Sequence, residues 1–428
     1  MHAAVVIFDH LSVDYLGCYG NTWIETPHFD RFASRAVTFD CCFAGDSAGA
    51  TETAGRSASQ ADEDWLNLIA ALRAAGVRIS VCSEHHEADA LAGQVDRLKV
   101  VSGSDDASAS SAERPFRRLV ETASALADEP LDGGTPSLLW VESRGVPSPW
   151  LPPTEVAGVY WDEFFSEREF ALLLDTLSNQ KDQDRKRIAA HDADRRLAGL
   201  LPELSDSGLF HRDHHGGPRE IAGLNRAVYA AYVSAIDAWF GLLLDRLDQS
   251  APTDLLLIVT GRAGDLIGDH PAIRAGCPPL LDPLLRVPLI AGRLTGDAHG
   301  SRRRGLVGTR DLWATLGDWF GIDDSRWIED SYSWRPQIHG DSEGPERKRV
   351  FSCGAGSGWS VRTPEFRCVV DTVPEESDDQ EGNWLFLKPD DMNDILSVVS
   401  QYPDEATRLR KEIEGHYLRD RDEAALDD

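Results

Sequence analysis

An unbroken apolar run near the middle of the chain, Leu255–Val259, constrains the fold more than any other segment. It has no polar residues at alternate positions, which is typical of a parallel strand that is buried on both faces of a sheet. The turn Gly261–Gly264 follows it and carries Arg262, and a second apolar run, Ala3–Phe8, ends in Asp9. Because working side chains of open α/β sheets lie where strands end, we expect Asp9 and this turn at one edge of the sheet, within a side-chain length of each other.

Strand-like and helix-like segments alternate along residues 1–329. This alternation predicts an α/β fold, a three-layer α/β/α sandwich whose mixed or mostly parallel sheet is covered on both faces. Residues 150–217 fit the alternation poorly, and we expect an irregular elaboration there. In residues 330–428 short strand-like runs precede one helix, Asp404–Tyr417, which predicts a smaller C-terminal α+β domain. The predicted strands of the larger part are Ala3–Phe8, Val37–Phe43, Val77–Cys82, Ser137–Val141, Leu255–Val259 and Val287–Ala291, and its main predicted helices are Trp65–Ala75, Arg114–Leu126, Arg219–Leu247 and Asp311–Phe320.

The excess of acidic residues argues against some classes of binding partner. The chain has 43 Lys and Arg residues against 72 Asp and Glu residues, a formal net charge of −29, which argues against a nucleic-acid or anionic-membrane surface. Its seven cysteines are scattered and form no CxxC pair, so we expect reduced thiols. No leader-like segment precedes the first strand and no apolar run reaches membrane-spanning length, and we therefore expect a cytoplasmic location without a membrane partner.

Several ordered stretches together resemble one known family. The opening VVIFDHLSVDYLGCYGNTWIETPHFDRFASRAVTFD resembles the first strand, loop and helix of the sulfatase family of the alkaline phosphatase superfamily. The stretch NRAVYAAYVSAIDAWFGLLLDRL is similar to the helix before that family's metal-binding strand, and WLFLKPDDMNDI to its C-terminal segment. The resemblance implies the sulfatase-type α/β/α core over residues 1–329 and the smaller C-terminal domain over residues 330–428.

The resemblance also implies a divalent cation, normally calcium, which polarises the ester and activates the nucleophile. Asp9 matches the family's first acidic ligand, and His10 stands where a second Asp is common. The family's ligand Asp and ligand His fall on Arg262 and Ala263. A guanidinium has no acceptor and cannot bind a cation, so Asp9 is the only matching metal ligand left. We therefore expect no metal and no other cofactor.

The nucleophile and the substrate-binding groups depart from the family pattern as well. The family carries Cys-x-Pro-x-Arg or its Ser form, whereas the matching region here is GDSAGATETAGRS, in which Ser47 is one hydroxyl that could take the role. Glu142 and Pro147 stand where the family places histidines after the strand Ser137–Val141. The family's basic residue after the metal-binding strand could survive as Arg274, with the spacing off by one. Together with His10, Arg262 and Arg274, Ser47 would then line a vestigial pocket.

Five histidines in two short stretches are the remaining candidates for a metal site. They lie in polar, loop-like stretches without the spacing of known zinc motifs, so the preferred interpretation is that they are solvated. The residues are His85, His86, His211, His214 and His215.

Three hypotheses for the function remain open, since fold alone does not fix function. The preferred one is a pseudoenzyme that has lost sulfuric-ester hydrolysis and acts as a binding or scaffold protein for an unknown protein partner. The second is a non-hydrolytic binder of an anionic small molecule, using Arg262 with Arg56 or Arg274. The third is an active calcium-dependent sulfate or phosphate ester hydrolase with a rearranged site that uses Asp9, His10 and a Ser or Thr.

A specific contact follows from the first hypothesis. We expect the guanidinium of Arg262 to pair with Asp9, directly or through one water, and to replace the cation electrostatically. In the alternative arrangement Arg262 extends into solvent and Asp9 caps a nearby backbone turn.

Overall fold

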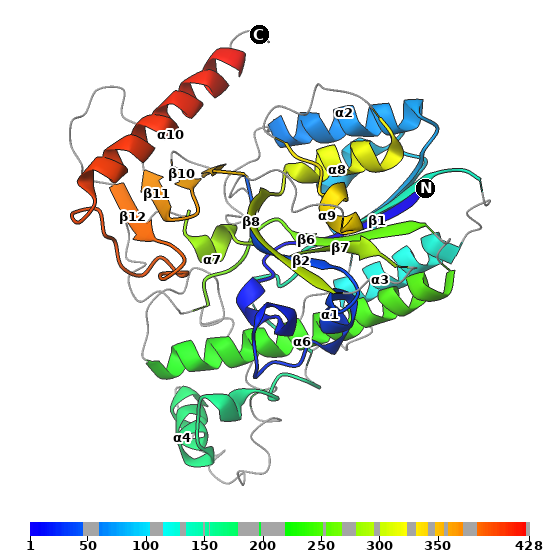
Figure 1. Cartoon of the computed structure of the whole chain (residues 1–428). Helices are drawn as coiled ribbons and strands as arrows, with labels where there is room; N and C mark the ends of the chain where they lie inside the picture. The colour runs from blue at the N-terminus through cyan, green and yellow to red at the C-terminus, as the bar shows by residue number, and fades with distance from the viewer. Residues whose placement is uncertain are drawn as a thin grey trace.

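A computed structural model describes the protein (Figure 1). The described residues are 1–45, 60–102, 114–128, 134–148, 150–153, 155–178, 197, 219–250, 254–267, 280–294, 300–322, 331–340, 347–354, 358–370 and 383–424.

An eight-stranded sheet forms the centre of the molecule, in the order β4-β3-β5-β1-β6-β7-β2-β8. Every strand is parallel to β1 except β7, which runs antiparallel to both of its neighbours, so the sheet is mostly parallel as the alternation of elements predicts. The strands are β1 (His2–Phe8), β2 (Val37–Phe43), β3 (Arg78–Ser83), β4 (Arg97–Val100), β5 (Ser137–Ser143), β6 (Leu255–Gly261), β7 (Leu289–Arg293) and β8 (Ser301–Gly308).

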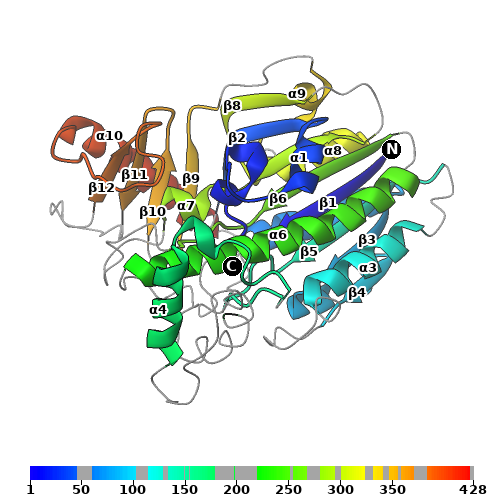
Figure 2. The same ribbon diagram turned by 90° about the horizontal axis from the view of Figure 1, so that it is seen from below.

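The two faces of this sheet bury two separate apolar clusters, which explains the unbroken apolar runs. In β1, Ala4, Val6 and Phe8 pack on one face, and the residues between them pack on the other. Helices α1, α3 and α6 cover the first face and α2, α8 and α9 the second (Figures 1 and 2). The predicted α/β/α sandwich is therefore confirmed. The covering helices are α1 (Pro27–Ala33), α2 (Gln60–Ala74), α3 (Pro115–Asp128), α6 (Arg219–Ser250), α8 (Asp311–Phe320) and α9 (Arg335–His339).

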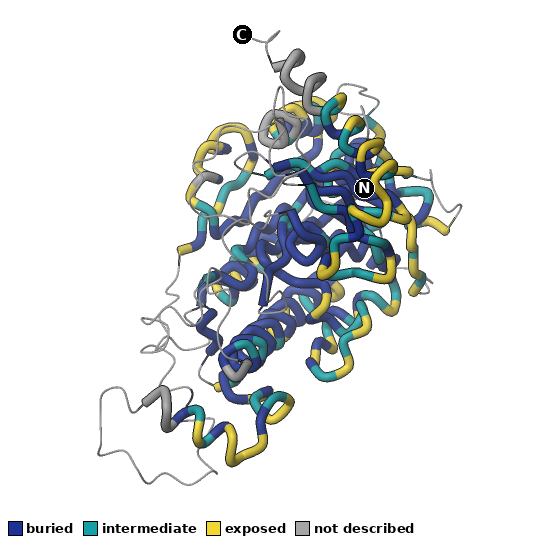
Figure 3. The backbone as a smooth tube through the Cα atoms, turned by 90° about the vertical axis from the view of Figure 1, so that its left-hand side faces the viewer, coloured by how far each residue is buried: buried dark blue, intermediate teal, exposed yellow. Residues whose placement is uncertain are grey.

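Helix α6 corrects one expectation from the sequence. Its segment Ile221–Gln249 is long and apolar enough to cross a membrane by length and composition, although no such run was expected. Its apolar window is 83% buried inside the protein, as in the core helix of a soluble fold. Figure 3 shows buried residues along most of this helix and along the central strands.

A smaller unit, here called the C-terminal lobe (residues 347–424), follows the core. Four antiparallel strands in the order β12-β11-β10-β9 pack against helix α10 around their own apolar cluster, as predicted for an α+β appendage. Val350, Val369 and Phe386 from this lobe join the apolar cluster on the second face of the large sheet. The elements are β9 (Val350–Cys353), β10 (Trp359–Arg362), β11 (Phe366–Val370), β12 (Asn383–Leu387) and α10 (Pro403–Ala424).

Two strands of the large sheet, β4 and β8, have no counterpart among the predicted strands. Both lie at the ends of the strand order and are therefore edge strands. The first half of β8 reads Ser-Arg-Arg-Arg-Gly, and edge strands are commonly protected by charged residues that hide an apolar strand pattern. Within the predicted elaboration, the structure describes a short helix, α4 (Glu167–Ser178), while residues 179–196 and 198–218 lie outside the described residues.

Candidate functional site

Three strand ends bring the candidate site together. Strand β1 lies between β5 and β6, with Phe8 opposite Ser143 on one side and Gly261 on the other. The amide of Arg262 donates to the carbonyl of Phe8 at 3.0 Å, and the amide of Asp9 donates to the carbonyl of Ser143 at 2.9 Å. Asp9 and the turn Gly261–Gly264 therefore lie at the same edge of the sheet, as expected.

The side chain of Arg262 reaches across the end of β1 towards β5. Its Nη2 donates a short hydrogen bond to Oε1 of Glu142, and its Nη1 lies 3.9 Å from Oδ1 of Asp9. Neighbouring strands are about 4.8 Å apart, so a long side chain is needed to span from β6 to β5. The expected pairing with Asp9 is present as an ion pair, but the closer partner is Glu142, which the sequence did not suggest.

Glu142 is anchored on its other sides by neutral donors. Nε1 of Trp140 donates to Oε1 of Glu142 at 2.8 Å, and Oγ of Ser83 donates to Oε2 at 2.9 Å. Burial by itself would raise the pKa of this carboxyl, but the Arg262 guanidinium and these hydrogen bonds outweigh burial and lower it. Glu142 is therefore an ionised, fully anchored acceptor for the guanidinium.

Asp9 has a second close neighbour, His85, that the sequence interpretation missed. Nε2 of His85 lies 3.1 Å from Oδ2 of Asp9, and the His85 side chain is only 18% exposed. The interpretation of His85 as a solvated histidine was wrong, whereas His86 is indeed exposed. Burial would raise the pKa of Asp9, but Arg262 and then His85 outweigh that effect and leave it well below its ordinary value.

His10 is held in place by the backbone around it. It adopts a left-handed conformation with φ of 58°, and its Nδ1 lies 3.4 Å from the carbonyl of Gly264. The hydroxyl of Tyr229, from α6, donates to the carbonyl of His10 at 2.6 Å and accepts from the amide of Ser12 at 2.9 Å. These contacts tie the turn after β1 to the turn after β6 and to the long helix.

A glycine close to Asp9 fixes the shape of this edge. Gly145 has φ of 60°, and a Cβ at this position would lie 1.7 Å from the carbonyl oxygen of Asp9. Only glycine allows this backbone approach. The loop after β5 is thus pressed directly onto the residue that carries the candidate ligand.

The other candidate residues from the sequence lie in segments outside the described residues. Ser47 and Arg274 lie outside the described residues. The same holds for Arg56, His211, His214 and His215.

The residues at this edge do not fit the divalent cation that the resemblance implies. Ala263 is buried and has no ligand atom, and the guanidinium of Arg262 lies against Asp9, the one matching ligand, and against Glu142. Across the described part of the chain, no group of three or more His, Cys, Asp or Glu side chains is arranged to hold a metal ion. A hard cation such as calcium takes roughly six to eight oxygen ligands.

His85 could have been identified from the sequence as a polar residue that closely follows a buried strand. Asp9 was identified because it follows a buried strand, and the strand β3 is followed by Glu84 and His85 in the same way. Parallel strands end at the same edge, so these side chains were candidates on the same grounds. Glu84 lies there too, where its Oε2 accepts from Oγ of Ser143 at 3.0 Å.

Comparisons with known proteins identify the fold. No family model matches the sequence, and no curated protein does. Among solved structures, the chain is similar to a protein in complex with its substrate D-glucosamine-2-N,6-O-disulfate, with a TM-score of 0.69, 16% identity and 98% of both chains covered. It is also similar to a 2-O GAG sulfatase, with a TM-score of 0.67, 16% identity, and 99% of this chain and 93% of that chain covered.

A third structure belongs to a different hydrolase class. The phosphonate monoester hydrolase of Agrobacterium radiobacter matches with a TM-score of 0.65 and 16% identity, covering 98% of this chain and 95% of that chain. The chain therefore has the fold of sulfatases and phosphonate monoester hydrolases, and the resemblance noted in the sequence is confirmed at the level of the fold. Identity this low carries no further conclusion about activity.

Proposed function

We propose that this protein keeps the sulfatase fold but has lost sulfuric-ester hydrolysis, and that it acts as a binding or scaffold protein. The observation that carries the proposal is the position of Arg262, whose guanidinium contacts both Glu142 and Asp9. It supplies a fixed positive charge but offers no acceptor or open coordination position to a substrate oxygen.

Electrostatics favour a structural role for this guanidinium. At about 4 Å and an effective dielectric near 20, an ion pair gains roughly 4 kcal/mol before desolvation is subtracted. Two carboxylates at a strand end would repel each other without a cation. Arg262 relieves this repulsion within the chain itself, so the fold has no need of a bound metal at this edge.

The same contacts weaken the anion-binding alternative. A guanidinium that recognises a sulfate or phosphoryl group must direct its donors towards the ligand. Those of Arg262 face carboxylates, and Asp9, Glu84 and Glu142 outnumber it at this edge. We therefore propose a protein partner rather than an anionic small molecule.

One observation favours a second candidate, a hydrolase that works without a metal. Nε2 of His85 lies 3.1 Å from Oδ2 of Asp9, and a carboxylate this close to an imidazole can support it as a general base. In that case the base would be His85 and not His10, and the nucleophile would lie outside the described residues.

Activity and metal content together test the proposal. The purified protein is analysed for bound metals and is incubated with aryl sulfate, phosphate and phosphonate esters, with and without a chelator. We expect no stoichiometric metal and no turnover above that of a buffer blank. Chelator-sensitive turnover would contradict the proposal, and turnover that resists the chelator but disappears in His85→Ala would favour the second candidate.

A further inference from the structure

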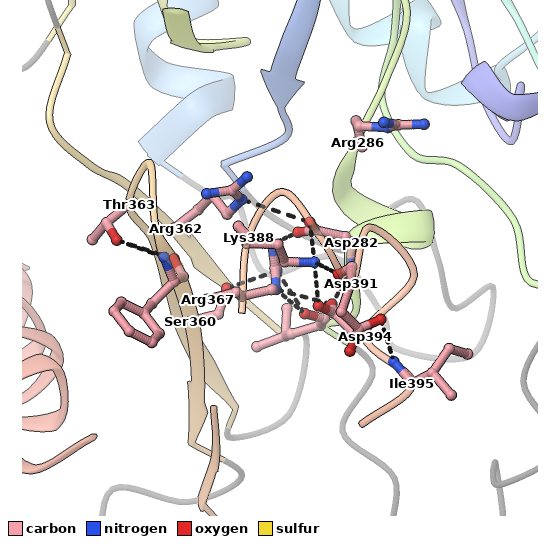
Figure 4. A network of polar contacts seen from close by, with 12 residues as sticks. Asp282, Arg286, Ser360, Arg362, Thr363, Arg367, Lys388, Asp391, Asp394 and Ile395 are labelled. Carbon is pink, nitrogen blue, oxygen red and sulfur yellow. Dashed lines mark hydrogen bonds and ion pairs between the residues drawn. The ribbon is translucent and has the colours of Figure 1, made fainter. Parts of the chain in front are cut away.

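A second group of charged residues lies where the C-terminal lobe meets the core. It consists of five side chains whose exposed fractions are between 0 and 4% (Figure 4). One comes from the core, namely Asp282 in the short helix α7 (Asp282–Leu285). The other four come from the lobe and are Arg362, Arg367, Lys388 and Asp394.

Residues of the lobe bind Asp282 on several sides. Nζ of Lys388 lies 2.7 Å from Oδ2 of Asp282 and 2.5 Å from Oδ1 of Asp394. Arg367 makes a short hydrogen bond to Oδ1 of Asp282, and Nε of Arg362 lies 3.6 Å from its Oδ2. The backbone amide of Asp282 donates to Oδ2 of Asp394 at 2.6 Å. Both the carboxylate and the amide of this one core residue are thus bound by the lobe.

Helix α7 in turn supports the turn that carries Arg262. The amide of Gly264 donates to the carbonyl of Leu284 at 2.7 Å. A Cβ on Gly264 would lie 2.0 Å from the carbonyl oxygen of Pro283, so backbone touches backbone at this point. A shift of α7 must therefore move the turn Gly261–Gly264 or break this contact.

We propose that the five buried charges form a clasp through which docking of the C-terminal lobe positions Arg262, with Asp282 as the positioning residue. Buried charges are costly unless they are paired, so a displacement of α7 that separates Asp282 from Lys388 and Arg367 is disfavoured. Arg367 also donates from Nε to the carbonyl of Leu280 at 3.0 Å, which fixes the residue two positions before Asp282. This inference holds whether or not the Arg262 site retains hydrolytic activity.

Hydrogen exchange measured by mass spectrometry on the full chain tests the clasp. Lys388→Met removes the ammonium that Asp282 and Asp394 share. We expect exchange at least about tenfold faster in residues 280–286 and also in residues 261–267, because both depend on α7. Strand β5 should keep its protection, since β1 separates it from β6, the strand that leads into the turn.

Three further variants make the test specific. Arg408→Met removes exposed ion pairs of α10 in the same lobe and should change neither segment. Leu409→Ala opens the apolar cluster of the lobe without touching the clasp, and should speed exchange in the lobe but not in residues 261–267. If Lys388→Met does not fold, Asp394→Asn weakens the clasp while keeping an acceptor for the amide of Asp282, and the same pattern is expected.

Two results would overturn the clasp. In the first, residues 261–267 keep their protection in Lys388→Met or Asp394→Asn while residues 280–286 lose theirs, which would show that α7 does not support the turn. In the second, Leu409→Ala accelerates exchange in residues 261–267 as strongly as Lys388→Met does, which would show that general loosening of the lobe is sufficient.

Discussion

At the residue scale, one guanidinium connects the carboxylates at the strand ends. Arg262 extends from β6 across β1 and contacts carboxylates on both other strands. Trp140 and Ser83 hold Glu142 in place, and His85 holds Asp9. The result is a network in which Arg262 lies between two carboxylates, one of which also accepts hydrogen bonds from neutral donors.

Removing the guanidinium should destabilise the fold. Arg262→Ala leaves Asp9 and Glu142 without their shared cation, and we expect a loss of about 2–3 kcal/mol in the free energy of unfolding, less than for a fully buried pair because Arg262 is 26% exposed. Urea denaturation measures this loss. Arg293→Ala, which removes an exposed ion pair with Asp254 in the same sheet, is the matched control and should cost below about 1 kcal/mol.

A double-mutant cycle between Arg262 and Glu142 separates the energy of their ion pair from the effect of lost packing. If the two side chains interact as described, Arg262→Ala combined with Glu142→Gln should cost less than the sum of the single variants. Full additivity, or an Arg262→Ala variant as stable as the wild type, would mean that the guanidinium contributes nothing at this edge.

The pH dependence of stability follows from the lowered pKa of Glu142. A carboxyl whose folded pKa lies below its unfolded value stabilises the fold above the unfolded value, here 4.5, and that contribution is lost as the pH falls through the folded pKa. We expect the wild type to lose stability below about pH 4.5 more steeply than Glu142→Gln. If the melting temperatures of the two proteins depended equally on pH between pH 3 and pH 7, the ionised pair would be contradicted.

At the element scale, two backbone approaches hold the loops at the strand ends. Gly145, after β5, lies against the carbonyl of Asp9, and Gly264, after β6, lies against the carbonyl of Pro283 in α7. These approaches help to fix the positions of the two loops. The site is therefore sensitive to the smallest change in side-chain size at these two glycines.

A glycine pair tests this sensitivity. Gly145→Ala should lower the stability by more than about 3 kcal/mol or prevent folding, because the new Cβ would overlap the carbonyl of Asp9. Gly93 also has a positive φ, of 82°, but no atom lies within 4 Å of its Cβ position, so Gly93→Ala should cost only about 1 kcal/mol of backbone strain. Similar costs for both variants would show that backbone strain, and not the close approach, dominates at Gly145.

The strength of the sequence signals explains which elements were predictable. Long apolar runs identified β1 and β6, and the boundaries of β2 and α8 agree with those predicted. Strand β8 was missed because charges on an edge strand conceal its pattern. Asp9 and Arg262 could be placed at one edge because each follows a buried strand, but Glu142 could not be assigned as the partner, since the sequence does not give the strand order that puts β5 beside β1.

At the scale of the whole molecule, the core and the C-terminal lobe share an apolar cluster and the buried clasp around Asp282. The fold is that of sulfatases and phosphonate monoester hydrolases over nearly the entire chain. The difference that we propose is local, since Arg262 would supply a positive charge where the resemblance implies a metal ion. On this proposal the architecture remains intact because the charge lies between the same strand ends.

Calcium binding tests this central claim most directly. Calorimetric titration of calcium into the purified, chelator-treated wild-type protein should give no binding heat and no rise in melting temperature, because Arg262 already neutralises Asp9 and Glu142. A one-to-one calcium complex that raises the melting temperature and is abolished by Asp9→Asn would contradict the account.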